Sequence, residues 1–145
     1  LEENVNEIVV SDINEKNRNV SFLILLRISN TIPYDEEPVG HKSGNVFIKA
    51  KNIGNNANAS IKQTVEFINS GVDIYAELRG VNGKFEFYSN WTNDYGRIGS
   101  VMHTFTGARY AMSGVESISI YVQRMDGTTA EIKAGAILKM YRRYV

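Results

Sequence analysis

The stretch from residue 72 to residue 91 constrains the fold most, because its sequence specifies its own strand pairing. Two runs of alternating apolar and polar residues, the signature of half-buried strands, flank the sequence Gly80-Val81-Asn82-Gly83. An Asn-Gly pair between two such runs favours a two-residue hairpin turn, since both turn positions need positive φ. In that register the buried side carries the pairs Leu78–Phe87 and Ile74–Trp91, and the polar side carries Arg79–Glu86, Glu77–Tyr88 and Tyr75–Asn90. Because one register satisfies both sides, we predict an antiparallel hairpin at this position.

Strand candidates separated by turn signals continue along the rest of the chain, and we find no long helical pattern. They lie at residues 6–13, 20–28, 45–51, 59–67, 97–105, 115–124 and 128–140. Many short strands in succession favour a sandwich or a barrel. At 145 residues the chain suits one core, so we predict a single all-β domain over residues 1–145, an antiparallel two-sheet β-sandwich. Since residue 1 is not Met, we expect this domain to be a fragment of a larger protein.

The last predicted hairpin turns at Met125-Asp126-Gly127. A two-residue turn at Asp126-Gly127 would set Val122 against Glu131, whereas a three-residue loop with Gly127 in the left-handed conformation matches the two faces. This loop gives the pairs Ile120–Ile132 and Val122–Ala130. We therefore predict one long final strand, which carries on one face Ile132, Ala134, Ala136, Leu138 and Met140.

The strand predicted at residues 20–28 is apolar on both faces. Four residues point to one side, and Leu23 and Leu25 point to the other. A strand of this kind is covered on both sides, by a loop or by a neighbouring subunit. The end of the chain is basic and aromatic, and Arg and Tyr are residues that anchor interfaces. A structural alternative is therefore an assembly or trimerisation domain that buries Leu23, Leu25, Tyr141, Arg142 and Tyr144.

The charge balance excludes several classes of function. Sixteen Lys and Arg residues balance sixteen Asp and Glu residues, so the formal net charge is zero. Proteins that bind duplex nucleic acid or membrane surfaces need a basic excess, and we expect neither partner here. The chain contains no cysteine, which excludes a disulfide framework and thiolate chemistry. The longest apolar run, residues 22–26, is too short to span a bilayer.

Aromatic and polar side chains gather on the polar side of the first hairpin and on the loop after it. Sugars present apolar C–H faces, which an aromatic ring covers, and hydroxyl groups, which amide, carboxylate and guanidinium groups bind. The simpler interpretation is that tyrosine favours strands. As the site of a glycan partner we predict Tyr75, Glu77, Glu86, Tyr88, Asn90, Asn93, Asp94, Tyr95 and Arg97.

Signals for metal binding or catalysis are weak. The acidic run Asp35-Glu36-Glu37 has the oxygen ligands that Ca²⁺ prefers, but it lacks the spacing of a known calcium loop, so we expect no cofactor. The two histidines, His41 and His103, have no metal-ligand spacing. A glycoside hydrolase that uses Glu77 and Glu86 is a third alternative, because glycosidic cleavage needs two carboxyl groups in one groove. The exposed strand face argues against it, and we expect no enzyme.

The end of the chain carries a family resemblance. Residues Ser117-Ile118-Ser119-Ile120-Tyr121-Val122 and the run from Gly127 to Leu138 are similar to the last two strands of many jelly-roll carbohydrate-binding modules. The order of elements also resembles the β-sandwich domains near the ends of bacteriophage tail spikes and fibres. The resemblance implies a sandwich of jelly-roll type that recognises a glycan without catalysis. It also implies a place on a virion or at a cell surface, and often a homotrimer.

Overall fold

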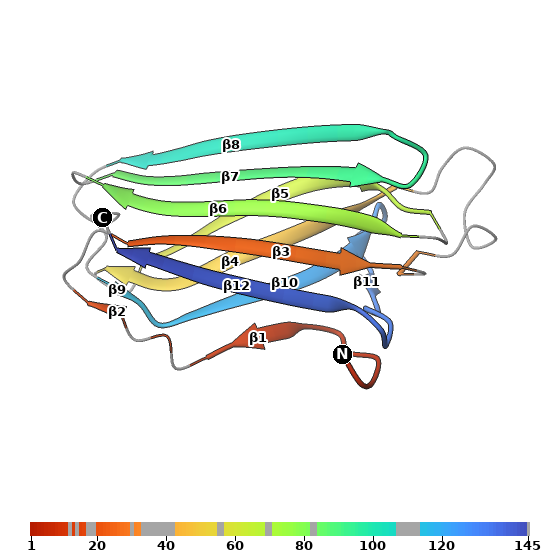
Figure 1. Ribbon diagram of the computed structural model, residues 1–145, viewed down its shortest axis with the longest axis horizontal. Coiled ribbons are helices and arrows are strands. Elements are labelled where there is room, and N and C mark those ends of the chain that lie inside the picture. The colour runs from red at the N-terminus through yellow and green to blue at the C-terminus, as the bar shows by residue number, and fades with distance from the viewer. Residues whose placement is uncertain are drawn as a thin grey trace.

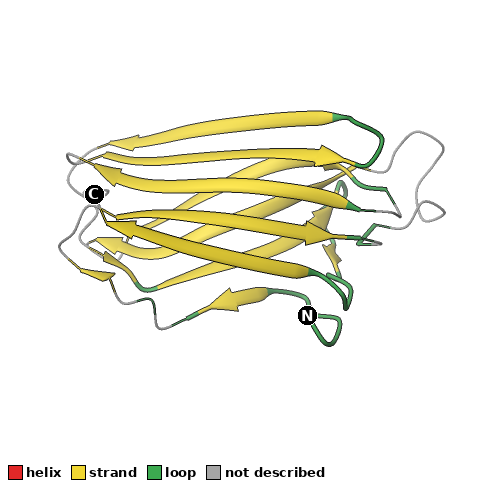
Figure 2. Ribbon diagram, in the orientation of Figure 1, coloured by secondary structure: helices red, strands yellow, loops and turns green. Residues whose placement is uncertain are grey.

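The computed structural model describes residues 1–11, 13, 15–16, 20–29, 31–32, 43–54, 57–68, 71–81, 84–106 and 114–144. Within these residues the chain forms strands and turns and contains no helix (Figure 2). Two antiparallel sheets pack against each other (Figure 1), which confirms the predicted β-sandwich. The sheet nearer the viewer in Figure 1 is called the front sheet below, and the other is called the back sheet.

The front sheet contains, in spatial order, β12 (Ile137–Tyr144), β3 (Val20–Ile28), β6 (Val72–Val81), β7 (Lys84–Asn93) and β8 (Ile98–Thr106). The back sheet contains β1 (Ile8–Val10), β10 (Ser117–Arg124), β4 (Ser43–Gly54) and β5 (Ala57–Glu66), with β11 (Thr129–Ala130) beside β10. The short strands β2 (Glu15–Lys16) and β9 (Gly114–Val115) pair with each other. The early strands β3 and β4 pair with the late strands β12 and β10, one pair in each sheet.

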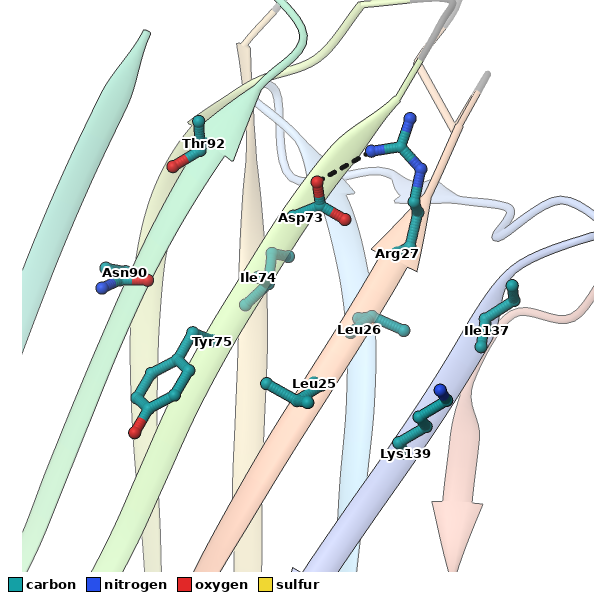
Figure 3. A pocket seen from close by; sticks show the side chains of 10 residues that line it. All are labelled: Leu25, Leu26, Arg27, Asp73, Ile74, Tyr75, Asn90, Thr92, Ile137 and Lys139. Atoms are coloured by element: carbon teal, nitrogen blue, oxygen red, sulfur yellow. Dashed lines mark hydrogen bonds and ion pairs between the residues drawn. The ribbon is translucent and has the colours of Figure 1, made fainter. Parts of the chain in front are cut away.

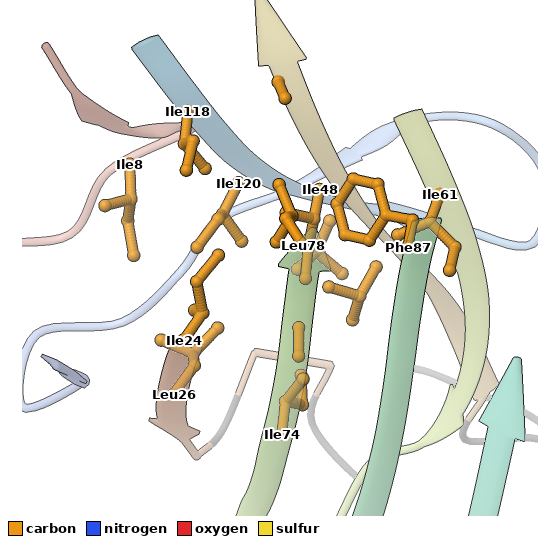
Figure 4. Packing of buried hydrophobic residues seen from close by; sticks show 14 of the residues in the cluster. Ile8, Ile24, Leu26, Ile48, Ile61, Ile74, Leu78, Phe87, Ile118 and Ile120 are labelled. Atoms are coloured by element: carbon orange, nitrogen blue, oxygen red, sulfur yellow. The ribbon is translucent and has the colours of Figure 1, made fainter. Parts of the chain in front are cut away.

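Alternation along the strands builds the core between the two sheets. Ile24 and Leu26 of β3 point inward toward Ile48 of β4 and Ile120 of β10, and all four are at most 2% exposed (Figure 4). A polar bridge crosses this core from Gln63 of β5 to Ser89 of β7. The Gln63 amide donates to the Ser89 carbonyl oxygen at 3.2 Å, and the Ser89 hydroxyl donates to the Gln63 amide oxygen at 2.5 Å. The bridge satisfies both buried side chains, as a polar pair in a core requires.

The register predicted for the β6–β7 hairpin is confirmed throughout. Apolar partners meet on the inner side, and the outer side carries the predicted pairs Arg79–Glu86, Glu77–Tyr88 and Tyr75–Asn90. The turn residues 82 and 83 lie outside the described residues, and the flanking residues 81 and 84 pair with each other.

The end of the chain differs from the prediction. The three-residue loop is confirmed, with Gly127 at φ 88° and Val122 paired with Ala130. The predicted pair Ile120–Ile132 is wrong, because β1 occupies that edge of β10 and Ile120 pairs with Ile8 there. The chain therefore leaves the back sheet after β11, turns at residues 134–135 and enters the front sheet as β12, so the single strand predicted over residues 128–140 is also wrong.

Candidate functional site

The outer face of the front sheet carries most of the residues predicted to bind a ligand. The strand registers place side chains of β12, β3, β6 and β7 in rows across this face. Two neighbouring rows, called the central band below, consist of Lys139, Leu25, Tyr75 and Asn90, and of Tyr141, Leu23, Glu77 and Tyr88. The band joins residues from four strands. β6 and β7 are neighbours in the sequence, whereas β3 and β12 are far from them and from each other.

Two tyrosines lie next to each other on the β6–β7 side of the central band. Tyr75 of β6 and Tyr88 of β7 meet edge to face, with ring centroids 6.4 Å apart and an interplanar angle of 73°. The Asn90 side-chain amide donates to the Tyr88 hydroxyl at 3.2 Å. Tyr75 is 37% exposed and Tyr88 is half-buried, so both rings lie on one accessible face, as the sequence predicted.

An arginine cluster borders the band at one end. The Arg27 guanidinium lies 2.8 Å from the Asp73 carboxylate and 2.8 Å from the Asp94 carboxylate. The hydrogen bonds that Arg27 donates to Asp94, and to a smaller extent those that it donates to Asp73, raise the pKa of Arg27, so the group stays charged. Gly71, at φ 140°, makes room for it, because a Cβ atom there would lie 2.6 Å from an Arg27 nitrogen. Arg27 is therefore held in place by β6 and by the β7–β8 turn.

A second ion pair borders the opposite end of the band. The Arg79 guanidinium donates to one carboxylate oxygen of Glu86, from Nε at 3.1 Å and also from Nη2. This hydrogen bonding raises the pKa of Arg79. Both groups are partly exposed, so the pair contributes little stability, but it fixes where the Glu86 oxygens lie.

Two open hollows flank the tyrosine pair. The larger has a volume of about 450 Å³, with Leu25, Tyr75 and Asn90 of the central band in its lining (Figure 3). Lys139, Ile137, Thr92 and the Arg27–Asp73 ion pair complete its rim. The smaller has a volume of about 200 Å³ and is lined by Glu77, Arg79, Glu86, Tyr88 and Met102. Tyr75 and Tyr88 thus stand between two hollows that both carry charged hydrogen-bonding groups.

The β7–β8 turn holds the remaining predicted ligand residues, and one prediction there is wrong. Asn93 is only 2% exposed, and its amide donates to the Glu66 carbonyl oxygen at 3.2 Å while its side-chain oxygen accepts from the backbone N–H groups of Tyr95 and Arg97. Asn93 therefore shapes the turn and is not available to a ligand. Tyr95 is 81% exposed, and Arg97 lies 3.5 Å from the Glu66 carboxylate. Asp94 contacts the border of the band through Arg27.

The predicted interface residues divide between the two sides of the front sheet. Leu23, Leu25 and Tyr141 all belong to the central band, beside the tyrosine pair. Arg142 pairs with the inward-pointing Phe22 and so lies on the other side of β12 from Tyr141. The side chain of Tyr144 is outside the described part of the structure. The sequence analysis missed Lys139 and Ile137, because nothing local to β12 indicates that it pairs with β3.

No metal or membrane feature stands out among the residues that the structure describes. They contain no group of three or more His, Asp or Glu residues that could hold a metal ion, and no helix that could cross a membrane. Asp35, Glu36, Glu37 and His41 lie outside the described residues.

A scan against protein-family models and a search of the curated proteins found no match to this chain. The resemblance to carbohydrate-binding modules and phage fibre domains therefore stays a prediction.

Proposed function

We propose that the chain is a non-catalytic glycan-recognition module that binds saccharides across the central band. The observation that carries the proposal is the edge-to-face pair of Tyr75 and Tyr88, accessible on an open sheet face between two polar-rimmed hollows. The apolar face of a pyranose stacks on such rings, and Leu25 extends the apolar floor beside Tyr75. The setting that we propose is a larger virion or cell-surface protein.

Hydroxyl recognition comes from the polar groups that surround the rings. Asn90 supplies an amide and Glu77 a carboxylate within the band, and Glu86 supplies a carboxylate that Arg79 already orients. Charged acceptors of this kind make the stronger hydrogen bonds to hydroxyl groups. Both hollows are open to solvent, so we expect each site to bind in the micromolar to millimolar range, with several copies supplying avidity.

The arrangement favours binding over hydrolysis. The Glu86 carboxylate is engaged by Arg79, which suits an acceptor of hydrogen bonds rather than a donor of protons. Turnover on a polysaccharide panel that is lost in Glu77→Gln would overturn the non-catalytic proposal.

Binding is tested with a glycan array, followed by calorimetry on the best glycan. We expect Tyr88→Ala and Tyr75→Ala each to weaken binding by about tenfold, the loss of about 1.4 kcal/mol of stacking. Tyr121→Ala is the matched control, because Tyr121 stacks on Phe47 within the back sheet, where the two ring centroids lie 4.8 Å apart. Equal affinity in the parent and in both front-sheet variants, or equal losses in all three, would contradict the proposal.

A second candidate function is assembly through the β3–β12 side of the front sheet. Two exposed apolar side chains favour this assembly: Ile137 and Tyr141 are both 54% exposed, beside the half-buried Leu23 and Leu25. Light scattering separates the two functions, because Leu25→Ser dissociates an assembly that uses this side. A parent chain that is monomeric at all concentrations would remove this candidate.

A further inference from the structure

The edge of the front sheet at β8 borders the proposed glycan site, because Met102 of β8 also lines the smaller hollow. β8 pairs with β7 along nine residue pairs in continuous register, and no strand among the described residues pairs with its other edge. Ile98 and Met102 on its outer face are 76% and 67% exposed. His103 points to the inner side, opposite Phe87 in the register, and is nevertheless exposed. The edge therefore offers a row of backbone groups and apolar side chains to another strand.

In the part of the chain that the structure describes, β8 lacks the features that normally prevent two sheet edges from pairing. Such edges carry charged residues, proline, bulges or a cover. The β8 sequence contains no Lys, Arg, Asp, Glu or Pro. The opposite edge of the same sheet, β12, carries Lys139, Arg142 and Arg143. One edge of the front sheet is thus protected by charge, and the other is not.

We propose that two copies of this chain pair antiparallel through β8, across a two-fold axis that passes beside Met102. In this register Met102 meets the partner's Met102, Ser100 meets the partner's Thr104, and Val101 meets the partner's His103. Each residue then stays on its own face of the sheet, as the side-chain period of two requires. No pair brings like charges of acidic or basic residues together, so β8 is complementary to itself, which a two-fold interface demands.

The same two-fold pairing is unfavourable at the other edge of the front sheet, β12. This contrast supports a second copy of the chain as the partner of β8. Antiparallel pairing of β12 about Tyr141 would place Lys139 against the partner's Arg143, and directly opposed like charges destabilise a sheet. A closed pair through β8 leaves only the charged β12 edges at the two ends of the joined front sheets. The two outer faces become continuous, and the two central bands lie on the same side of the dimer.

Sedimentation velocity over a wide range of concentration tests the dimer. We expect a reversible monomer–dimer equilibrium, and Met102→Lys should weaken it by about tenfold or more, because the new charge meets itself across the axis. Thr92→Lys on the neighbouring strand is the matched control, because Thr92 is also exposed on the outer face. A parent that stays monomeric, a trimer, or equal effects of both variants would overturn the inference. Unfolding curves confirm that each variant is folded.

Cysteine cross-linking tests the register itself, because the chain contains no cysteine. Facing residues of antiparallel strands have Cα atoms about 4.5–5.5 Å apart, within the reach of a disulfide. With oxidised glutathione as the oxidant, which takes up two electrons and two protons, two thiols of Met102→Cys should join in a covalent dimer. Ser100→Cys should cross-link far more slowly, since it faces the partner's Thr104. The reverse order of rates would overturn this pairing. Neither test depends on glycan binding, so failure of the dimer leaves the proposed function standing.

Discussion

The indole of Trp91 lies beside Gly99, at the point where β7 meets β8. The two residues are register partners, and Trp91 is only 7% exposed. A Cβ atom built on Gly99 would overlap the indole nitrogen and approach a ring carbon at 2.8 Å. The alternation around Trp91 predicts that it points inward. The alternation does not predict which residue of the next strand leaves space for the indole, because that depends on how the strands pair in the folded protein.

Replacing Gly99 with alanine should therefore destabilise the protein. The added methyl group forces the indole out of its place, and such overpacking costs about 1–3 kcal/mol. Urea unfolding followed by far-ultraviolet circular dichroism measures the loss, because this signal is present with or without a tryptophan. The matched control is the same substitution in a Trp91→Phe background, where the smaller ring makes room and the cost should fall. A cost that is equal in both backgrounds would contradict this account.

Elements that are neighbours in the chain could be predicted from the sequence, and elements brought together from far apart could not. The β6–β7 register follows from alternation on two adjacent runs, which specifies one pairing. The placement of β12 beside β3 has no local signal, so the sequence predicts Leu23, Leu25 and Tyr141 as interface residues, separately from the ligand residues of β6 and β7, and does not indicate Lys139. Asn93 had a signal that was not used, because Asn before a Gly-containing turn commonly bonds the backbone ahead of it.

The crossover from β11 to β12 is held by the first residues of the chain. Val5 and Ile132 exchange two backbone hydrogen bonds, at 2.9 and 2.8 Å. The side chain of Asn4 donates to the Glu131 carboxylate at 3.0 Å and accepts from the Ala134 N–H at 2.7 Å. These contacts fix the segment on which the chain passes from one sheet to the other.

Removing the Asn4 side chain should loosen this crossover and leave the hairpins intact. Asn4→Ala deletes two exposed hydrogen bonds, and we expect a loss of about 1 kcal/mol. Hydrogen exchange should accelerate at the Ala134 amide and remain unchanged in the β6–β7 hairpin. Asn6→Ala, two residues further on at an exposed position, is the control. Unchanged exchange at Ala134 would show that the segment is held by the backbone bridge alone.

The whole molecule combines zero net charge with exposed apolar side chains on one sheet. Its formal charges cancel, and the isoelectric point calculated from the sequence is about 7.0. The apolar groups of the front sheet include Ile98, Met102, Ile137 and Tyr141, all more than half exposed. A molecule of this kind has little long-range repulsion to oppose contact between such surfaces.

Solubility should therefore pass through a minimum close to pH 7.0. Below this pH the chain gains positive charge, and above it the chain gains negative charge, so repulsion returns on both sides. Precipitation by polyethylene glycol, measured from acid to alkaline pH, gives the curve. A solubility that changes in one direction only across this range would refute the prediction.

The Gln63–Ser89 bridge has a mechanical consequence for the sandwich. If one sheet slid over the other, the Gln63 amide and the Ser89 hydroxyl would separate. Both would then remain unpaired in the hydrophobic core, at a cost of about 1–3 kcal/mol for each unpaired group. The bridge therefore favours one relative position of the two sheets. Because Ser89 lies on β7, next to Tyr88, the same bridge ties the strand that carries this tyrosine to the opposite sheet.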